Sequence, residues 1–216
     1  PIESVEGFVR QILGWREFIR GVYWTEGPDY VDRNGLESVG DLPEWYWTGE
    51  TDLECLRDSI DQVVEYGYGH HIQRLMITGN FALISGVDPR AINDWYVGMF
   101  VDAIDWVTTP NTVGMVMHAD GGIVGTKPYA ASANYIGRMS PHCKACSWNR
   151  KARTGEDACP FNVFYWDFMI RNRERLRGNR RMAIALKNVD RLDPEERERI
   201  VETAESHRRR LGVAAD

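Results

Sequence analysis

Apolar residues recur along this chain at intervals of three and four, and no segment shows a convincing alternation of apolar and polar residues. In the first periodic segment Phe8, Ile12, Trp15, Ile19 and Val22 fall on one face of a helix. Hydrophobic residues make up 43% of the 216 positions, enough to bury a sizeable core and to exclude wholesale disorder. The sequence therefore predicts an all-α fold.

Start and stop signals divide the chain into helices and loops. We expect helices over residues 8–22, from a capping box at 51–54 to about Tyr66, over 70–84, from the N-cap Asp88 through Asp102 toward Pro110, over 161–176, and from Asp193 onward. Residues 25–50 and 109–140 are rich in Gly and Pro and are predicted to be loops. A loop as long as the second is usually functional or disordered, and its aromatic content argues against disorder.

Charge and hydropathy limit the classes of function. The net charge of −6 argues against a general polyanion binder, although residues 171–216 carry 13 basic and 9 acidic residues. We expect Arg208, Arg209 and Arg210 to form a solvated helix end. No apolar run approaches the roughly 18–20 residues of a membrane span, and no signal peptide is present, so we expect a soluble cytoplasmic protein. Because the chain starts at Pro1 and enters a helix almost at once, we expect it to be part of a longer protein.

Four cysteines are the strongest local signal. Cys143 and Cys146 form a CxxC pair, Cys159 is followed by Pro160, and Cys55 lies far upstream on a predicted helix. Four thiolates suit either a tetrahedral zinc ion or an iron–sulfur cluster, and spacing alone does not separate the two. Two disulfides would fit poorly with a chain that lacks a secretory signal. We expect one metal centre, which requires the fold to bring Cys55 to the other three thiols.

Two further groups carry chemistry. The doublet His70 and His71 opens an amphipathic helix, where adjacent side chains point about 100° apart, so one can face a cleft and act as a general acid. Asp102 and Asp105 lie three apart on the predicted helix that ends at Pro110. A buried Asp102 would need a cation, and Arg74 on the preceding helix is the natural partner.

Several stretches resemble one family. The runs over residues 8–21 and 22–24 look like the flavin-domain signature of the photolyase and cryptochrome superfamily. Residues 70–81, 93–96, 125–132 and 154–161, together with the one-plus-three cysteine pattern, resemble the iron–sulfur bacterial cryptochromes and photolyases. The resemblance covers nearly the whole chain.

The resemblance implies an all-α FAD-binding domain that carries one [4Fe–4S] cluster. Residues 1–216 would be the C-terminal part of that domain, with a charged C-terminal helix at 193–216, and the family's N-terminal α/β antenna domain would be absent. It also implies a bacterial cytoplasmic protein, expected to be a monomer, whose partner is UV-damaged DNA.

Family roles carry over by position. The implied cluster ligands are Cys55, Cys143, Cys146 and Cys159, and the implied flavin contacts are the Arg74–Asp102 ion pair, Asp105, Thr108 and Asn111. His70 and His71 would face the DNA lesion, with His71 transferring the proton, and Trp15, Tyr129 and Tyr135 would line the lesion pocket. Trp47, Trp95 and Tyr96 would relay electrons to the flavin. Thr108 departs from the Glu that family members often carry there, which puts the flavin's redox behaviour in question.

Three functions follow as hypotheses. The first is a light-driven lyase that repairs pyrimidine (6–4) photoproducts by electron transfer from reduced FAD, with His-assisted proton transfer. The second is a blue-light photoreceptor of the cryptochrome type. The third is a non-enzymatic iron–sulfur module that binds nucleic acid and resembles the primase large subunit. The presence of bound flavin separates the first two from the third.

Overall fold

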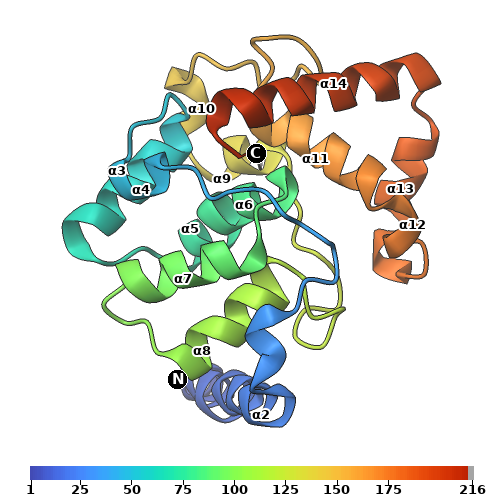
Figure 1. The fold of residues 1–216 in the computed structure, drawn as a ribbon. Helices are drawn as coiled ribbons and strands as arrows, with labels where there is room; N and C mark the ends of the chain where they lie inside the picture. The colour runs from blue at the N-terminus through green and yellow to red at the C-terminus, as the bar shows by residue number, and fades with distance from the viewer. Residues whose placement is uncertain (214–216) are drawn as a thin grey trace.

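The computed structural model describes residues 1–213 and is built from helices (Figure 1). The α-helices are α1 (Ile2–Val9), α2 (Glu17–Glu26), α3 (Trp45–Thr48), α4 (Glu54–Tyr66), α5 (His71–Gln73), α6 (Gly79–Ser85), α7 (Pro89–Met99), α8 (Asp105–Thr109), α9 (Ala133–Met139), α10 (His142–Ala145), α11 (Pro160–Arg171), α12 (Arg173–Leu176), α13 (Ala183–Asp190) and α14 (Pro194–Leu211). They are joined by three π-helical segments and two 3₁₀ segments. The π-helical segments are η1 (Arg10–Arg16), η3 (Arg74–Thr78) and η4 (Pro110–Val116), and the 3₁₀ segments are η2 (Asp29–Asp32) and η5 (Arg180–Met182). Within residues 1–213 the only β-structure is two isolated bridges, so the all-α prediction is confirmed.

Most of the predicted helices are present, with three differences. The predicted capping box at 51–54 is wrong. The residue before α4 is the extended Leu53, and the Thr51 hydroxyl accepts a bond from the Leu53 amide rather than from an amide in the first turn. The helix that starts at Asp88 ends at Met99 rather than running through Asp102. The stretch 109–140 contains η4 and α9, so only residues 117–132 form a long loop. The final predicted helix ends at Leu211, and residues 214–216 lie outside the described part.

The core is centred on α6, all of whose residues are buried. Its first residue, Gly79, has no room for a side chain, because a Cβ there would lie 2.5 Å from the Val116 side chain. The Asn80 side chain exchanges two hydrogen bonds with the backbone of Ala131, at 2.8 and 2.9 Å, and so fixes the long loop to the core. This contact explains why a segment rich in glycine is ordered.

The C-terminal helix is held by a buried charge. Asp167 on α11 is 0% exposed and accepts bonds from Arg171 at 2.7 Å and from Arg208 on α14. Arg208 also donates to the Ser85 carbonyl at 2.7 Å, so one guanidinium joins α6, α11 and α14. The prediction that Arg208 belongs to a solvated helix end is therefore wrong. An unpaired Asp167 would be costly in this position.

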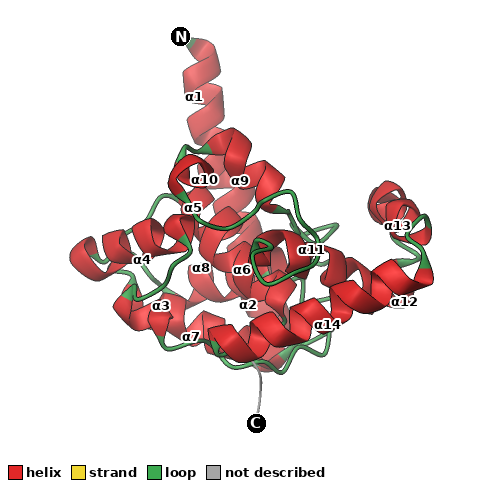
Figure 2. Cartoon of the chain, turned by 90° about the horizontal axis from the view of Figure 1, so that it is seen from above, coloured by secondary structure: helices red, strands yellow, loops and turns green. Residues whose placement is uncertain are grey.

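The first helix lies largely outside the core. Figure 2 shows α1 projecting away from the other helices. Of the predicted stripe, Ile19 and Val22 are buried, whereas Phe8 is 68% exposed. None of the helices in residues 1–213 combines the length and apolar character that a membrane span requires.

Acidification is expected to destabilise the fold through His207. This side chain is 2% exposed, packs against Trp148 and Phe164, and bonds the Ala158 carbonyl through Nε2 at 3.0 Å. Burial lowers its pKa from 6.5 in the folded state, so the unfolded chain binds the proton first as the pH falls. The free energy of unfolding should therefore fall with pH below about 6.5, by at most about 1.4 kcal/mol per pH unit for this one group.

Urea unfolding between pH 7.5 and 5 measures this slope. The His207→Gln variant is the comparison, because glutamine does not titrate there. Its slope should be shallower than that of the wild type, and equal slopes would contradict the assignment. His118 is also buried, and burial lowers its pKa as well. Both proteins should therefore keep a residual dependence of the unfolding free energy on pH.

Candidate functional site

A cavity of about 490 Å³ lies between three parts of the chain: η1 with the start of α2, α5 with η3, and residues 102–116. It brings together seven of the residues singled out in the sequence: Trp15, His71, Arg74, Tyr96, Asp102, Thr108 and Asn111. They come from segments separated by up to about half the chain, so tertiary packing rather than local sequence assembles the site. We call it the central cavity.

Arg74 and Asp102 form an ion pair at this cavity. Arg74 Nη2 donates to Asp102 Oδ2 at 2.9 Å, and Arg74 Nε donates to the Gly69 carbonyl at 2.8 Å. The guanidinium carbon lies 4.2 Å from the centre of the Phe100 ring. Because the two side chains are 23% and 47% exposed, the pair adds little to stability. Its effect is to orient a carboxylate whose Oδ1 has no hydrogen-bond partner in residues 1–213.

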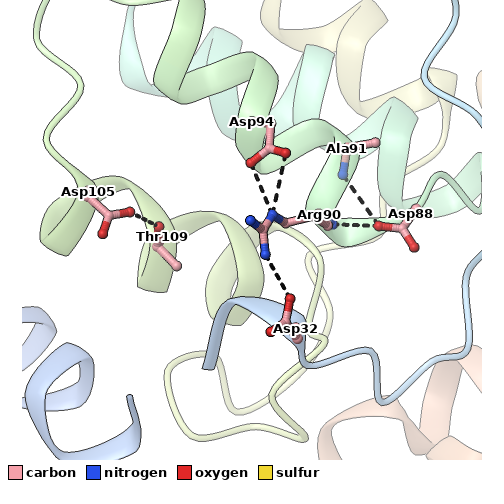
Figure 3. Close-up of polar contacts among 7 residues, drawn as sticks. All are labelled: Asp32, Asp88, Arg90, Ala91, Asp94, Asp105 and Thr109. Carbon is pink, nitrogen blue, oxygen red and sulfur yellow. Dashed lines mark hydrogen bonds and ion pairs between the residues drawn. The ribbon is translucent and has the colours of Figure 1, made fainter. Parts of the chain in front are cut away.

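Asp105 does not share this site. α7 ends at extended Phe100 and α8 begins after extended Ile104, so Asp102 lies in the turn between them and does not share a helical face with Asp105. Asp105 begins α8, where it accepts bonds from Tyr23 and from Thr109 Oγ1, the latter at 2.7 Å (Figure 3). It lines a different cavity, together with Arg90 and Asp94. The sequence-based placement of Asp105 beside Asp102 is therefore wrong.

The two adjacent histidines have different surroundings. His70 is the N-cap of α5: its Nδ1 accepts from the Ile72 amide at 3.1 Å, and its own amide donates to Gln73 at 2.9 Å. His71 lines the central cavity, whereas His70 is not among the lining residues. Partial desolvation, and then the charges of Arg74 and His70, lower the pKa of His71. Near neutral pH, His71 is therefore mainly the neutral imidazole.

Asn111 gives the cavity an unused acceptor. Its Nδ2 donates to the Val107 carbonyl at 2.7 Å, while its Oδ1 is buried and has no partner in the described residues. A buried polar atom without a partner is costly, typically about 1–3 kcal/mol, so it favours a ligand that donates a hydrogen bond. Together with the free oxygen of Asp102, it makes the cavity suitable for a ligand with ring N–H groups.

The lining residues that the sequence analysis missed include Gln11, Arg16 and Trp106. The Arg16 guanidinium lies 5.4 Å from the centre of the Trp106 ring, which is within the range of a cation–π contact. Gln11 and Trp15 are four residues apart, and that helical spacing could have identified Gln11. Trp106 carries no comparable signal, because the turn before α8 sets its direction.

Aromatic residues lead from the cavity toward the surface. Tyr96 lines the cavity, and its ring centre is 5.0 Å from that of Trp95. Trp95 is 5.1 Å from Tyr46 and donates to the Tyr46 carbonyl at 2.9 Å. Trp47 follows directly in the chain and is 47% exposed. The three residues predicted to relay electrons thus comprise one at the cavity, one in the core and one at the surface.

Two predicted lesion-pocket residues lie elsewhere. Tyr129 is 38% exposed in the long loop and does not line the central cavity. Tyr135 on α9 lines a separate cavity formed with α11. Of the three residues assigned to the lesion pocket, the structure brings only Trp15 to His71.

The four cysteines line one small cavity. Cys55 comes from α4, Cys143 and Cys146 from α10 and its C-terminal end, and Cys159 from the residue before α11. All four are free thiols. The convergence of Cys55 with the CxxC pair, which the sequence analysis required, is therefore present. We call this the thiol cavity.

Burial raises the pKa of three of the four thiols: Cys55, Cys143 and Cys159. Burial, and then the three neighbouring cysteines, raise the pKa of Cys55, and burial raises that of Cys159 to about 12. Trp148 also lines the cavity, and its buried Nε1–H has no acceptor in residues 1–213. Within those residues, no group of three or more His, Cys, Asp or Glu side chains is arranged to hold a metal ion. The four thiols therefore share one cavity, but within the described residues they are not grouped as the ligands of a metal ion.

Comparison with known proteins gives two relatives, and no family model matches the chain. The chain is 56% identical over 183 residues, or 85% of its length, to a (6-4) photolyase of Agrobacterium fabrum (strain C58 / ATCC 33970). It spans 36%, about a third, of that protein's length. It is also 32% identical over 110 residues to uncharacterized protein R855 of Acanthamoeba polyphaga mimivirus, covering 51% of this chain and 82% of the viral protein.

Proposed function

Because the chain belongs to the photolyase and cryptochrome family, we propose that it is the flavin-binding helical part of a light-driven enzyme that repairs (6–4) photoproducts in DNA. The observation that carries the proposal is the central cavity, where His71 lies beside the Arg74–Asp102 pair and Asn111. The 56% identity to a (6-4) photolyase supports the same activity. UV-damaged DNA is the proposed partner.

The residues of the central cavity fit a flavin. Asn111 presents a buried oxygen without a partner, Asp102 presents a half-exposed carboxylate, and Arg74 and Thr108 line the same cavity and can donate hydrogen bonds. A reduced flavin held there would supply, on absorbing blue light, the electron that the lesion needs. Arg74 holds the Asp102 carboxylate in place, and the rings of Trp15 and Trp106 keep part of the cavity apolar.

His71 is proposed to deliver the proton that (6–4) repair requires. It lines the cavity on the same wall as Arg74, whose fixed positive charge helps to keep the imidazole neutral between turnovers. Imidazole is the side chain best able to give and recover a proton near physiological pH, and the lowered pKa makes the protonated form of His71 a stronger acid. Trp15, from the facing helix, offers a ring on which a flipped base can stack.

Tyr96, Trp95 and Trp47 are proposed to carry electrons from the surface to the flavin. Burial raises the pKa of Tyr96, and its hydroxyl bonds both Thr78 and the Arg74 carbonyl, so it stays protonated at rest. The successive ring contacts from Tyr96 through Trp95 to Tyr46 support a path in this direction.

The thiol cavity is proposed to hold a [4Fe–4S] cluster. Four cysteines that line one space match the thiolate ligand set of an iron–sulfur cluster, and the indole N–H without an acceptor could donate to one of its sulfur atoms. The cluster would join α4 to the segment that runs from α10 to α11. Its proposed role is structural, because metal binding contributes free energy to folding.

The Asp102→Asn variant is expected to weaken flavin binding by about tenfold, because it removes a charge-assisted bond while keeping the shape. Asp105→Asn is the matched control: Asp105 lines the other cavity and should leave flavin affinity within about twofold of the wild type. Quenching of flavin fluorescence on titration with the protein measures both. Equal losses in the two variants would contradict the assignment of Asp102.

Repair itself tests the function. An oligonucleotide with one (6–4) lesion, incubated with the flavin-loaded full-length protein, should regain intact pyrimidines under blue light and not in the dark. Flavin binding without light-dependent repair would refute the enzyme and favour a photoreceptor. A full-length protein that binds no flavin would refute both the enzyme and the photoreceptor.

A further inference from the structure

A second polar cavity, of about 430 Å³, lies between α9, residues 150–153, α11 and α13. It shares no lining residue with the central cavity. It is separated from the thiol cavity by α9 and the start of α11. On α9, Ala133 and Ile136 line the thiol cavity, whereas Tyr135 and Arg138 line the polar one.

Positive charge dominates this cavity. Arg138, Lys151 and Arg153 line it, and none of its lining residues is acidic. Arg153 already donates to Glu196 at 2.8 Å. Arg138 and Lys151 have no carboxylate partner in the part of the chain that the structure describes, and both are exposed. Two uncompensated cations at one concave surface favour an anionic ligand.

Flat aromatic surfaces complete the cavity. Tyr135, Tyr165 and Trp166 line it and are partly buried. The Arg153 guanidinium lies 4.3 Å from the centre of the Trp166 ring, so it holds that ring in place through a cation–π contact. The side-chain amides of Asn134 and Asn188, which also line the cavity, provide donors and acceptors of the kind that recognise base edges.

We propose that this cavity binds a nucleotide, with its phosphate between Arg138 and Lys151 and its base stacked on the aromatic residues. Phosphate groups pair with Arg and Lys, and any base can stack on an aromatic ring. A simple anion would use the cations but would have no need of the rings. The site is independent of the lesion-binding role proposed for the central cavity. The nucleotide is either free or part of a DNA strand.

Adenosine monophosphate and inorganic phosphate are the probes, measured by calorimetric titration of the 216-residue chain. Arg138→Gln combined with Lys151→Gln should weaken adenosine monophosphate binding by about tenfold or more. Arg180→Gln combined with Arg209→Gln is the control: these arginines are exposed, lie outside the cavity, and removing them changes the net charge equally. The control should stay within about twofold of the wild type.

Trp166→Leu separates a nucleotide site from a phosphate site. It should weaken adenosine monophosphate by about fivefold or more and leave inorganic phosphate unchanged, because only the base stacks. Circular dichroism establishes that each variant is folded. Equal affinity of the wild type for the two probes, or a loss in the control as large as in the Arg138 and Lys151 variant, would overturn the proposal.

Competition with a ten-residue oligothymidylate shows whether the bound nucleotide is free or part of a DNA strand. If the oligonucleotide displaces adenosine monophosphate from the wild type, and the Arg138 and Lys151 variant loses part of its oligonucleotide affinity, the site holds a nucleotide of a strand. If adenosine monophosphate binds without competition, the site holds a free nucleotide. Failure of the wild type to bind either probe would refute the site without bearing on repair at the central cavity.

Discussion

Replacing Cys55 with serine is expected to abolish metal binding and to remove the link that a bound metal would make between α4 and residues 140–159. The other three thiols come from one side of the cavity, and Cys55 alone joins them to the helix opposite. A serine hydroxyl does not deprotonate readily enough to replace a thiolate ligand. Because metal binding contributes folding energy directly, the loss should be comparable with the whole stability of a domain, about 5–15 kcal/mol.

Iron and acid-labile sulfide per chain, measured on anaerobically purified protein, are the primary readout. Ser59→Ala is the matched control: Ser59 is buried on the same helix one turn later, bonds the Cys55 carbonyl, and does not line the thiol cavity. It should retain the cluster. If Cys55→Ser does not fold, chelation of the wild type should still reduce its thermal stability. Iron without sulfide, or a Cys55→Ser variant with full iron content, would refute the cluster.

Local signals predicted the helices well where a cap is visible in the sequence. Asp88 and Asp193 each precede a proline, and both accept bonds from the first turn of α7 and α14. Such caps need only neighbouring residues, so the sequence alone is sufficient. The end of α7 is different, because the Val101 amide donates to the Gly67 carbonyl at 2.9 Å and draws the chain out of the helix. That bond joins segments far apart in the sequence.

In the segment that follows α8, the glycine content led to a wrong prediction of loop structure. Gly114 suggested a loop, yet it lies in η4. A Cβ at this position would come within 2.5 Å of Asp120 and 2.6 Å of the Tyr30 hydroxyl. The glycine therefore serves close packing in a helix rather than a turn, and only the tertiary structure distinguishes the two uses.

In the candidate site, too, some features could be predicted from the sequence and others depend on the tertiary structure. The pairing of Arg74 with Asp102 followed from the cost of an unpaired buried charge, although the aspartate is nearly half exposed. The convergence of four thiols followed from their shared chemistry. The family resemblance placed Asp105 at the flavin and Tyr135 at the lesion pocket. Each lines a different cavity, because short helices and breaks in the chain set their directions. Residue type predicted the partners, whereas orientation depended on the fold.

His71→Ala is expected to reduce (6–4) repair by about 100-fold or more while flavin remains bound, because it removes the proposed proton donor without altering Arg74, Asp102 or Asn111. The adjacent histidine provides a sharp control. His70 caps α5, and asparagine is also a good N-cap, so His70→Asn should retain both the helix and repair.

The pH dependence of repair separates chemistry from structure. If protonated His71 is the donor, the rate should rise as the pH falls from neutral toward the lowered pKa of His71, and this rise should vanish in His71→Ala. A purely structural role would lower the rate equally at every pH. Repair retained by His71→Ala, or lost equally in His70→Asn, would remove the assigned role, whereas loss in the first variant alone ties proton transfer to the one histidine that faces the cavity.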